Sequence, residues 1–299
     1  MAAEVVTSTS NVTKQKKKEL MFVTTTKRLL KNKLAVFGLV IIIIQVLLAI
    51  FAPLIVQHDP VKQNLMLAEL KPFSEGHWLG TDNYGRDMWS RIVYGARVSL
   101  IVGITSVLLG LIGGIALGLV SGYYRKLDGI IMRIVDLLFA FPGILLAMLI
   151  IAMLGTSLVN VAIAISIWSI PTCARIVRGS VLSVKKQEYI QALKSMGASD
   201  LRIMVKHILP NCMAPIIVFA TMRMATAILS TAALSYLGLG AQPPTPEWGA
   251  MIATGQDFMW TSPHMTIIPG IAIMLVVFAF NVVGDGLRDA LDPSMDLNN

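Results

Sequence analysis

The chain has 299 residues, of which 55% are hydrophobic and only 14% are charged, and its mean hydropathy is +0.71. A soluble domain of this length would need a far more charged surface, so the composition excludes that class. Apolar runs of about 20 residues recur, each long enough to cross a bilayer as a helix. Because these runs are continuous rather than alternating, they exclude a transmembrane barrel and predict an all-α, polytopic membrane protein with about six transmembrane helices.

The first third of the chain begins with residues 1–33, a polar and basic stretch that we predict to be a cytoplasmic N-terminal tail. The apolar run 34–56 is too long for the core of a secretory signal peptide, and no small-residue cleavage site follows it. It therefore predicts an uncleaved first span. A polar outer loop follows, with a helix expected from about Arg86, so residues 34–97 form one unit of span and loop.

The second span, residues 98–120, opens a five-helix core that we place at residues 98–285. Four glycines recur in and just after it with a period of four residues: Gly110, Gly114, Gly118 and Gly122. A helix face without side chains lets another helix approach closely. The repeat therefore predicts a packing face against another span.

The remaining spans are predicted at residues 129–154, 161–173, 215–237 and 265–283. Pro142 and Gly143 should kink the third span, and Pro171 should mark the inner end of the fourth. Arg133 and Asp136 should pair on one face of the third span. The Pro-rich outer connection after the fifth span contains a candidate short helix, and residues 286–299 form an acidic tail.

The basic residues predict the orientation of these spans. With six spans, 19 Lys and Arg residues fall in the inner segments and five in the outer loops. This bias places both termini in the cytoplasm of a multi-pass protein. It also explains the net charge of +8 by topology, without a nucleic-acid partner.

A polar stretch between the fourth and fifth spans, residues 188–211, has the pattern of an amphipathic helix pair. Gly197 can adopt a positive φ and should end the first helix; Ser199 or Asp200 should cap the second, and Pro210 should stop it. The apolar stripe is Ile190, Leu193, Met196, Leu201, Met204 and Ile208. An ordered helix pair here suits a surface that couples to another protein, whereas the plainer interpretation is a helix lying on lipid headgroups.

No catalytic constellation is visible in the sequence. The chain has no phosphate-binding G-x-x-x-x-G-K-[ST] loop, so we predict no ATPase site and no bound cofactor. The four histidines are scattered over loops without helical spacing, and the two cysteines lack metal-ligand partners. We therefore predict no metal site.

The polar stretch at residues 188–211 resembles the cytoplasmic coupling loop of import-type ABC-transporter permeases. The resemblance rests on Gln191-Ala192-Leu193, on Gly197 and on the Leu209-Pro210 ending, although Gln191 replaces the usual acid. Longer segments resemble the second permease subunit of dipeptide, oligopeptide and nickel importers: HWLGTDNYGRD, RIVYGARVSL, DGIIMRIVDLLFAFPGILLA, ALSYLGLGAQPPTPEWGAMI and GDGLRDALDPS.

The resemblance implies a type I ABC importer-like permease in a prokaryotic cell membrane. Its implied partners are a sister permease, two ATPase subunits that hold ATP and magnesium, an extracytoplasmic solute-binding protein, membrane lipid and a peptide substrate. Within residues 188–210 it implies an ATPase-coupling set of Glu188, Gln191, Ala192, Leu193, Met196, Gly197, Leu209 and Pro210.

Two departures from the family fall in the fifth span: Arg223 stands where a small residue is usual, and Thr231 where Glu is common. Arg223, Ala227, Ser230 and Thr231 share one face at helical spacing, which predicts a segment of the translocation path. The competing interpretation is that Arg223 snorkels to the inner interface.

Other functions remain open at this point. A permease for nickel or another small solute is the first, although the path shows no His or Cys ligand cluster. A membrane scaffold that docks a soluble protein without moving solute is the second. An ion channel is weaker, because no filter segment is evident.

Overall fold

The computed structural model describes residues 25–291, so most of the predicted N-terminal tail and the end of the C-terminal tail lie outside the described residues. The described part is helical and contains no strand. Its principal helices are α2 (Lys33–Ile55), α3 (Met88–Tyr123), α4 (Arg125–Phe139), α5 (Gly143–Leu154), α6 (Leu158–Lys185), α7 (Glu188–Ser195), α8 (Asp200–Ile203), α9 (Met213–Tyr236), α10 (Trp248–Gly255) and α11 (His264–Leu291).

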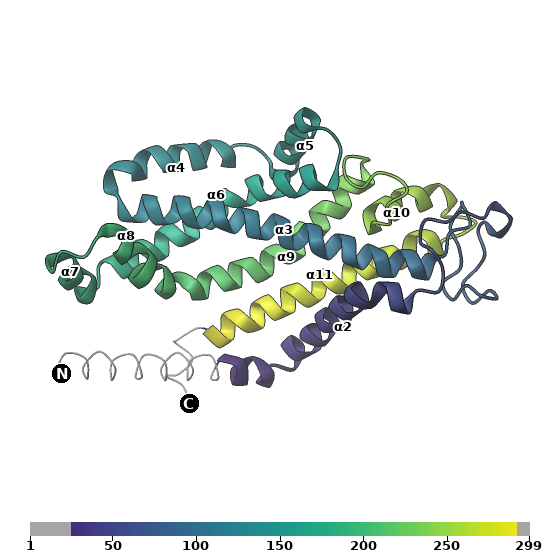
Figure 1. The fold of residues 1–299 in the computed structure, drawn as a ribbon, viewed down its shortest axis with the longest axis horizontal. Coiled ribbons are helices and arrows are strands. Elements are labelled where there is room, and N and C mark those ends of the chain that lie inside the picture. The colour runs from purple at the N-terminus through teal and green to yellow at the C-terminus, as the bar shows by residue number, and fades with distance from the viewer. Residues whose placement is uncertain (1–24, 292–299) are drawn as a thin grey trace.

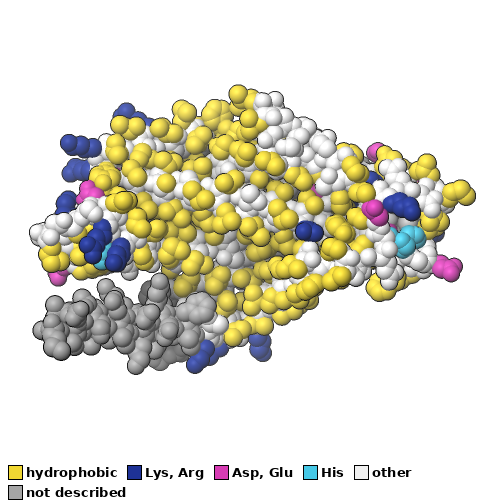
Figure 2. All heavy atoms as spheres, in the orientation of Figure 1, with side chains coloured by type: hydrophobic (Ala, Val, Ile, Leu, Met, Phe, Trp, Pro, Cys, Tyr) yellow, Lys and Arg dark blue, Asp and Glu magenta, His cyan; other side chains and the backbone are white. Residues whose placement is uncertain are grey.

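The long helices α2, α3, α6, α9 and α11 run lengthwise through the molecule (Figure 1). We call the end formed by α7 and α8 the hairpin end, and the opposite end, formed by residues 56–87 and α10, the loop end. Five helices are long and apolar enough to cross a membrane, or six when α4 and α5 count as one broken span. Apolar side chains cover the middle, and Lys and Arg gather at the hairpin end (Figure 2).

The helices α4 and α5 differ from the predicted third span. They meet at 90°, far more than a kink, and Pro142 at the break has extended backbone. Proline disfavours helical geometry at the residue before it, which ends α4. The predicted pair of Arg133 and Asp136 is also wrong, because Asp136 bonds Arg175 of α6 at 2.6 Å.

Prolines elsewhere interrupt helices less than predicted. Pro171 lies inside the continuous helix α6 and does not end it. Pro210 does not stop the helical path either, because a π-turn (Met204–Ile208) and a 3₁₀ turn (Leu209–Cys212) carry the chain from α8 into α9. Such local changes of helix type accommodate the missing proline N–H.

The glycine face of α3 packs against α6 of the same chain. A Cβ on Gly114 would lie 2.6 Å from Cys173 Sγ, and one on Gly118 would lie 2.6 Å from Val177 Cβ. Gly110 and Gly122 meet α6 in the same way, at Ser169 and Val181. Backbone and side chain are therefore in contact along four turns of α3.

Replacing Gly114 with leucine should destabilise the protein, since overpacking of a dense contact costs about 1–3 kcal/mol or more. We expect a lower melting temperature in detergent and a smaller yield of folded protein. The matched control is Gly129→Leu on α4, where none of residues 25–291 lies within 4 Å of an added Cβ. An unchanged melting temperature for Gly114→Leu would contradict the close α3–α6 contact.

Candidate coupling surface and translocation face

The hairpin end is built from α7 and α8, joined by a turn at Gly197. Gly197 has φ +77°, a left-handed conformation that glycine adopts without a Cβ penalty, so its predicted role in ending the first helix is confirmed. Ser199 stands at the N-cap of α8, but its side chain makes no capping bond. Asp200 accepts a 2.6 Å hydrogen bond from the Tyr123 hydroxyl at the end of α3.

The predicted apolar stripe divides into two faces. Ile190, Met204 and Ile208 are buried and pack in one core cluster with Val177, Val181 and Val184 of α6. Met196 is 73% exposed, Leu201 69% and Val205 52%. The buried face fixes the hairpin to the bundle, and the exposed face is available to another molecule.

The other coupling residues follow this division. Leu193 and Leu209 are half-buried, and Leu193 packs against the hairpin core rather than pointing outward as an anchor. Glu188, Gln191, Ala192, Gly197 and Pro210 are exposed. Sequence analysis did not select Val205, although its position four residues after Leu201 on a helical path gave the signal.

The face of α9 that was predicted to line a translocation path is only partly accessible within this chain. Ala227 and Thr231 are buried, and the Thr231 hydroxyl donates to the Ala227 carbonyl at 2.9 Å. Ser230 and Arg223 are half-buried. The four residues therefore lie on one helix, and only Arg223 and Ser230 among them are partly exposed.

Arg223 has an aromatic neighbour that sequence analysis did not select. Its guanidinium carbon lies 5.0 Å from the ring centroid of Trp168 on α6, a cation–π geometry. The Arg223 Nη2 atom is buried without a hydrogen-bond partner among the described residues. Trp168 also covers Gly143, where an added Cβ would collide with the indole ring. Arg223 thus lies beside the break between α4 and α5.

Two ion pairs hold α4 to α6 on the hairpin side of that break. Arg178 binds Asp128 through two hydrogen bonds of 2.6 and 2.7 Å, a bidentate arrangement. Arg175 binds Asp136 and also lies over the Phe139 ring, 4.0 Å from its centroid. Charged groups on α4 and α6 are therefore paired with each other.

Comparison with known families gives two matches. Residues 98–297 match the model of the binding-protein-dependent transport system inner membrane component, and residues 21–72 match the N-terminal transmembrane domain of oligopeptide transport permease C. The chain belongs to the peptide ABC-importer permease family. The predicted all-α permease of the import type is confirmed.

Curated relatives of the permease cover most of its length. It is 52% identical over 270 residues to the dipeptide transport system permease protein DppC of Alkalihalophilus pseudofirmus, covering 90% of this chain and 88% of that protein. It is 47% identical over 274 residues to the glutathione transport system permease protein GsiD of an Escherichia coli strain, covering 90% and 89%. A putative peptide transport permease of Brucella abortus is 45% identical, covering 92% and 93%.

A solved structure shares the fold of the permease. The match to an inward-facing MetNI methionine ABC transporter has a TM-score of 0.57 and 20% identity, covering 69% of this chain and 97% of the solved chain. At that identity the likeness concerns the fold alone. It supports the predicted type I importer architecture of the permease.

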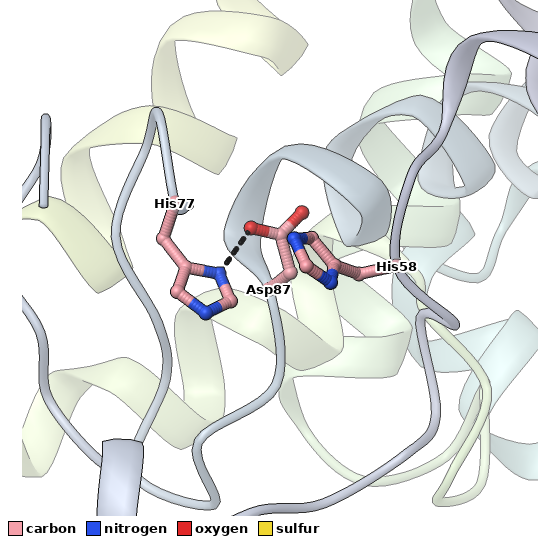
Figure 3. Close-up of side chains that lie close together, drawn as sticks. All are labelled: His58, His77 and Asp87. Atoms are coloured by element: carbon pink, nitrogen blue, oxygen red, sulfur yellow. Dashed lines mark hydrogen bonds and ion pairs between the residues drawn. The ribbon is translucent and has the colours of Figure 1, made fainter. Parts of the chain in front are cut away.

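Two histidines at the loop end of the permease lie together, so the prediction that the histidines are scattered is wrong for this pair. His58 and His77 lie together, with stacked rings whose centroids are 4.7 Å apart. Asp87, the N-cap residue of α3, lies beside them, with its Oδ1 2.9 Å from His77 Nδ1 (Figure 3). Residues separated by 19 and 10 positions thus converge, which no helical spacing in the sequence could indicate.

Proposed function

We propose that this permease forms half of the translocation path of an ATP-driven importer of di- and oligopeptides. The observation that carries the proposal is the hairpin end, where Met196, Leu201 and Val205 are exposed on an ordered helix pair anchored through its other face. An exposed apolar surface at the water-facing end of a membrane bundle marks a site that a soluble partner covers. The permease sequence shows no phosphate-binding loop, so the partner that covers it supplies the ATPase.

The proposed assembly pairs the permease with a sister permease and places two ATPase subunits, with their ATP and magnesium, at the hairpin end. The solute-binding protein docks at the loop end. Lys and Arg at the hairpin end favour a cytoplasmic location for that end and for both termini, in the inner or plasma membrane of a prokaryote (Figure 2). The functional units remain 1–33, 34–97, 98–285 with the coupling loop 188–210, and 286–299.

Peptide as substrate is supported by the relatives, which are named as permeases of dipeptide, glutathione and putative peptide transport systems. The competing substrates are nickel and other small solutes. The described residues of the α9 face include no His or Cys, which favours peptide over a metal ion there.

The test is reconstitution of the permease with its sister subunit, ATPases and binding protein in liposomes. We expect ATP-dependent uptake of a labelled dipeptide, with ATP hydrolysis stimulated by the loaded binding protein. Omitting the ATPase subunits is the control and should abolish uptake. Binding of ATPase subunits without uptake of any solute would instead indicate a scaffold, and uptake of nickel but not peptide would assign the alternative substrate.

A further inference from the structure

The loop end contains three potential metal ligands that peptide transport does not require. His58 follows α2, His77 lies in the following loop and Asp87 precedes α3, and one ligand atom from each lies within 4.8 Å of the others (Figure 3). In the described part of the chain, no other three His, Cys, Asp or Glu side chains meet this condition. The cluster lies far along the chain from the coupling residues and from α9.

Asp87 and His77 are held in place before any ion binds. Asp87 Oδ2 accepts hydrogen bonds from Ser90 N at 2.7 Å and from Ser90 Oγ at 2.6 Å, which leaves Oδ1 facing His77. His77 is 8% exposed and Asp87 4%, so neither side chain has much freedom. The carboxylate of Asp87 and the imidazole of His77 are therefore placed beside each other without an ion.

The hydrogen bonds also assign a free lone pair to each ring. His58 Nε2 lies 2.9 Å from the Gly76 carbonyl, and a carbonyl can only accept, so Nε2 carries the proton. By the same reasoning, His77 Nδ1 donates to the Asp87 carboxylate. His58 therefore keeps an unprotonated Nδ1. His77 Nδ1 becomes a ligand when its proton moves to Nε2 and the ion takes the place of that proton beside Asp87 Oδ1.

We infer that His58, His77 and Asp87 bind a divalent first-row transition-metal ion, such as Zn²⁺ or Ni²⁺, and thereby tie the end of α2 to the start of α3. Imidazole and carboxylate together suit these ions better than Mg²⁺ or Ca²⁺, which prefer oxygen ligands. The exposed His58 closes the site through its unprotonated Nδ1 and keeps its hydrogen bond to the Gly76 carbonyl. This inference does not depend on which solute the permease transports.

The site also has room for a ligand from outside the chain. Three protein ligands leave a fourth position open in a tetrahedral site. A pocket of about 100 Å³ adjoins the cluster and is lined partly by Ile55, Gln57, Trp78 and Trp89. Water or a side chain of a docked protein can therefore complete the coordination.

The test is calorimetric titration of the full-length permease, purified in detergent with a tag that contains no histidine, with ZnCl₂ and NiCl₂. We expect one ion per chain. His58→Gln should weaken binding by roughly tenfold or more, since it removes a ligand. The exposed position of His58 allows the fold to tolerate the change, which equal melting temperatures of the metal-free proteins would verify. His207→Gln, at the hairpin end, is the matched control and should bind as the parent does.

Two further readouts keep the test independent of folding. Saturating Zn²⁺ should raise the melting temperature of the parent and of His207→Gln, but not that of His58→Gln. Bound Co²⁺ should show the visible absorption of a four-coordinate site in the parent only. Equal affinity of His58→Gln and the parent, or no binding by the parent, would overturn the proposal and leave His77 and Asp87 as a structural hydrogen-bonded pair.

Discussion

Replacing Met196 with aspartate should weaken binding of the ATPase subunits and peptide-stimulated ATP hydrolysis while leaving the permease folded. Met196 is 73% exposed at the hairpin end, so a carboxylate there stays in water in the isolated chain. In the proposed complex the same carboxylate is buried in the ATPase groove. Truncation of a central interface residue typically costs about 2 kcal/mol or more, roughly a thirtyfold loss of affinity, and a carboxylate at that position must also be desolvated.

The measurement compares ATPase copurification and peptide-stimulated ATP hydrolysis for Met196→Asp and a matched control. Met66→Asp makes the same change at a 92% exposed methionine on the loop end, away from the proposed ATPase interface, and we expect it to retain ATPase copurification. Loss of copurification in both variants would point to a general effect of the charge. Full coupling in Met196→Asp would remove Met196 from the ATPase interface.

Gly197 offers a second variant of the same prediction. Nothing in the described part of the chain lies within 4 Å of an added Cβ, so Gly197→Trp finds room in the isolated permease but not in a close interface. The φ of +77° strains any other residue, and asparagine tolerates it best. Gly197→Asn therefore controls for backbone strain: it should keep most coupling, whereas Gly197→Trp should lose it.

The parts of the fold that were predicted correctly depend on local properties of the sequence. A membrane span must be apolar over about 20 residues, so hydropathy locates it without knowledge of its neighbours. The turn at Gly197 was likewise predictable, because a glycine between two short amphipathic helices indicates a left-handed residue. These signals need no tertiary structure.

Two prolines show where local signals fail. Pro142 separates helices that meet at 90°, whereas Pro171 lies inside an unbroken helix. At the break, Trp168 packs directly against Gly143, a tertiary contact that the sequence around Pro142 does not indicate. The pairing of Asp136 with Arg175, and the meeting of His58 with His77, depend on the tertiary fold in the same way.

The second large effect is expected from Arg223→Gln, which should reduce uptake of peptides with a free C-terminal carboxylate. Arg223 Nη2 is buried without a hydrogen-bond partner in the described part of the chain, so it has a donor available for an anion. A hydrogen bond to a charged group contributes about 1.5–3 kcal/mol, which corresponds to roughly ten- to hundredfold in affinity. C-terminally amidated peptides lack that charge and should lose much less.

The stability of the variant separates this role from snorkelling or structural packing. A desolvated guanidinium in a membrane span costs free energy, so glutamine at position 223 should leave the melting temperature unchanged or higher. Trp168→Leu is the companion variant: it removes the aromatic face 5.0 Å from the guanidinium carbon but keeps the charge. We expect it to retain the preference for free carboxylates. If Arg223→Gln imports free and amidated peptides in the same ratio as the parent, Arg223 makes no contact with the peptide carboxylate, and orientation toward the inner interface accounts for its position.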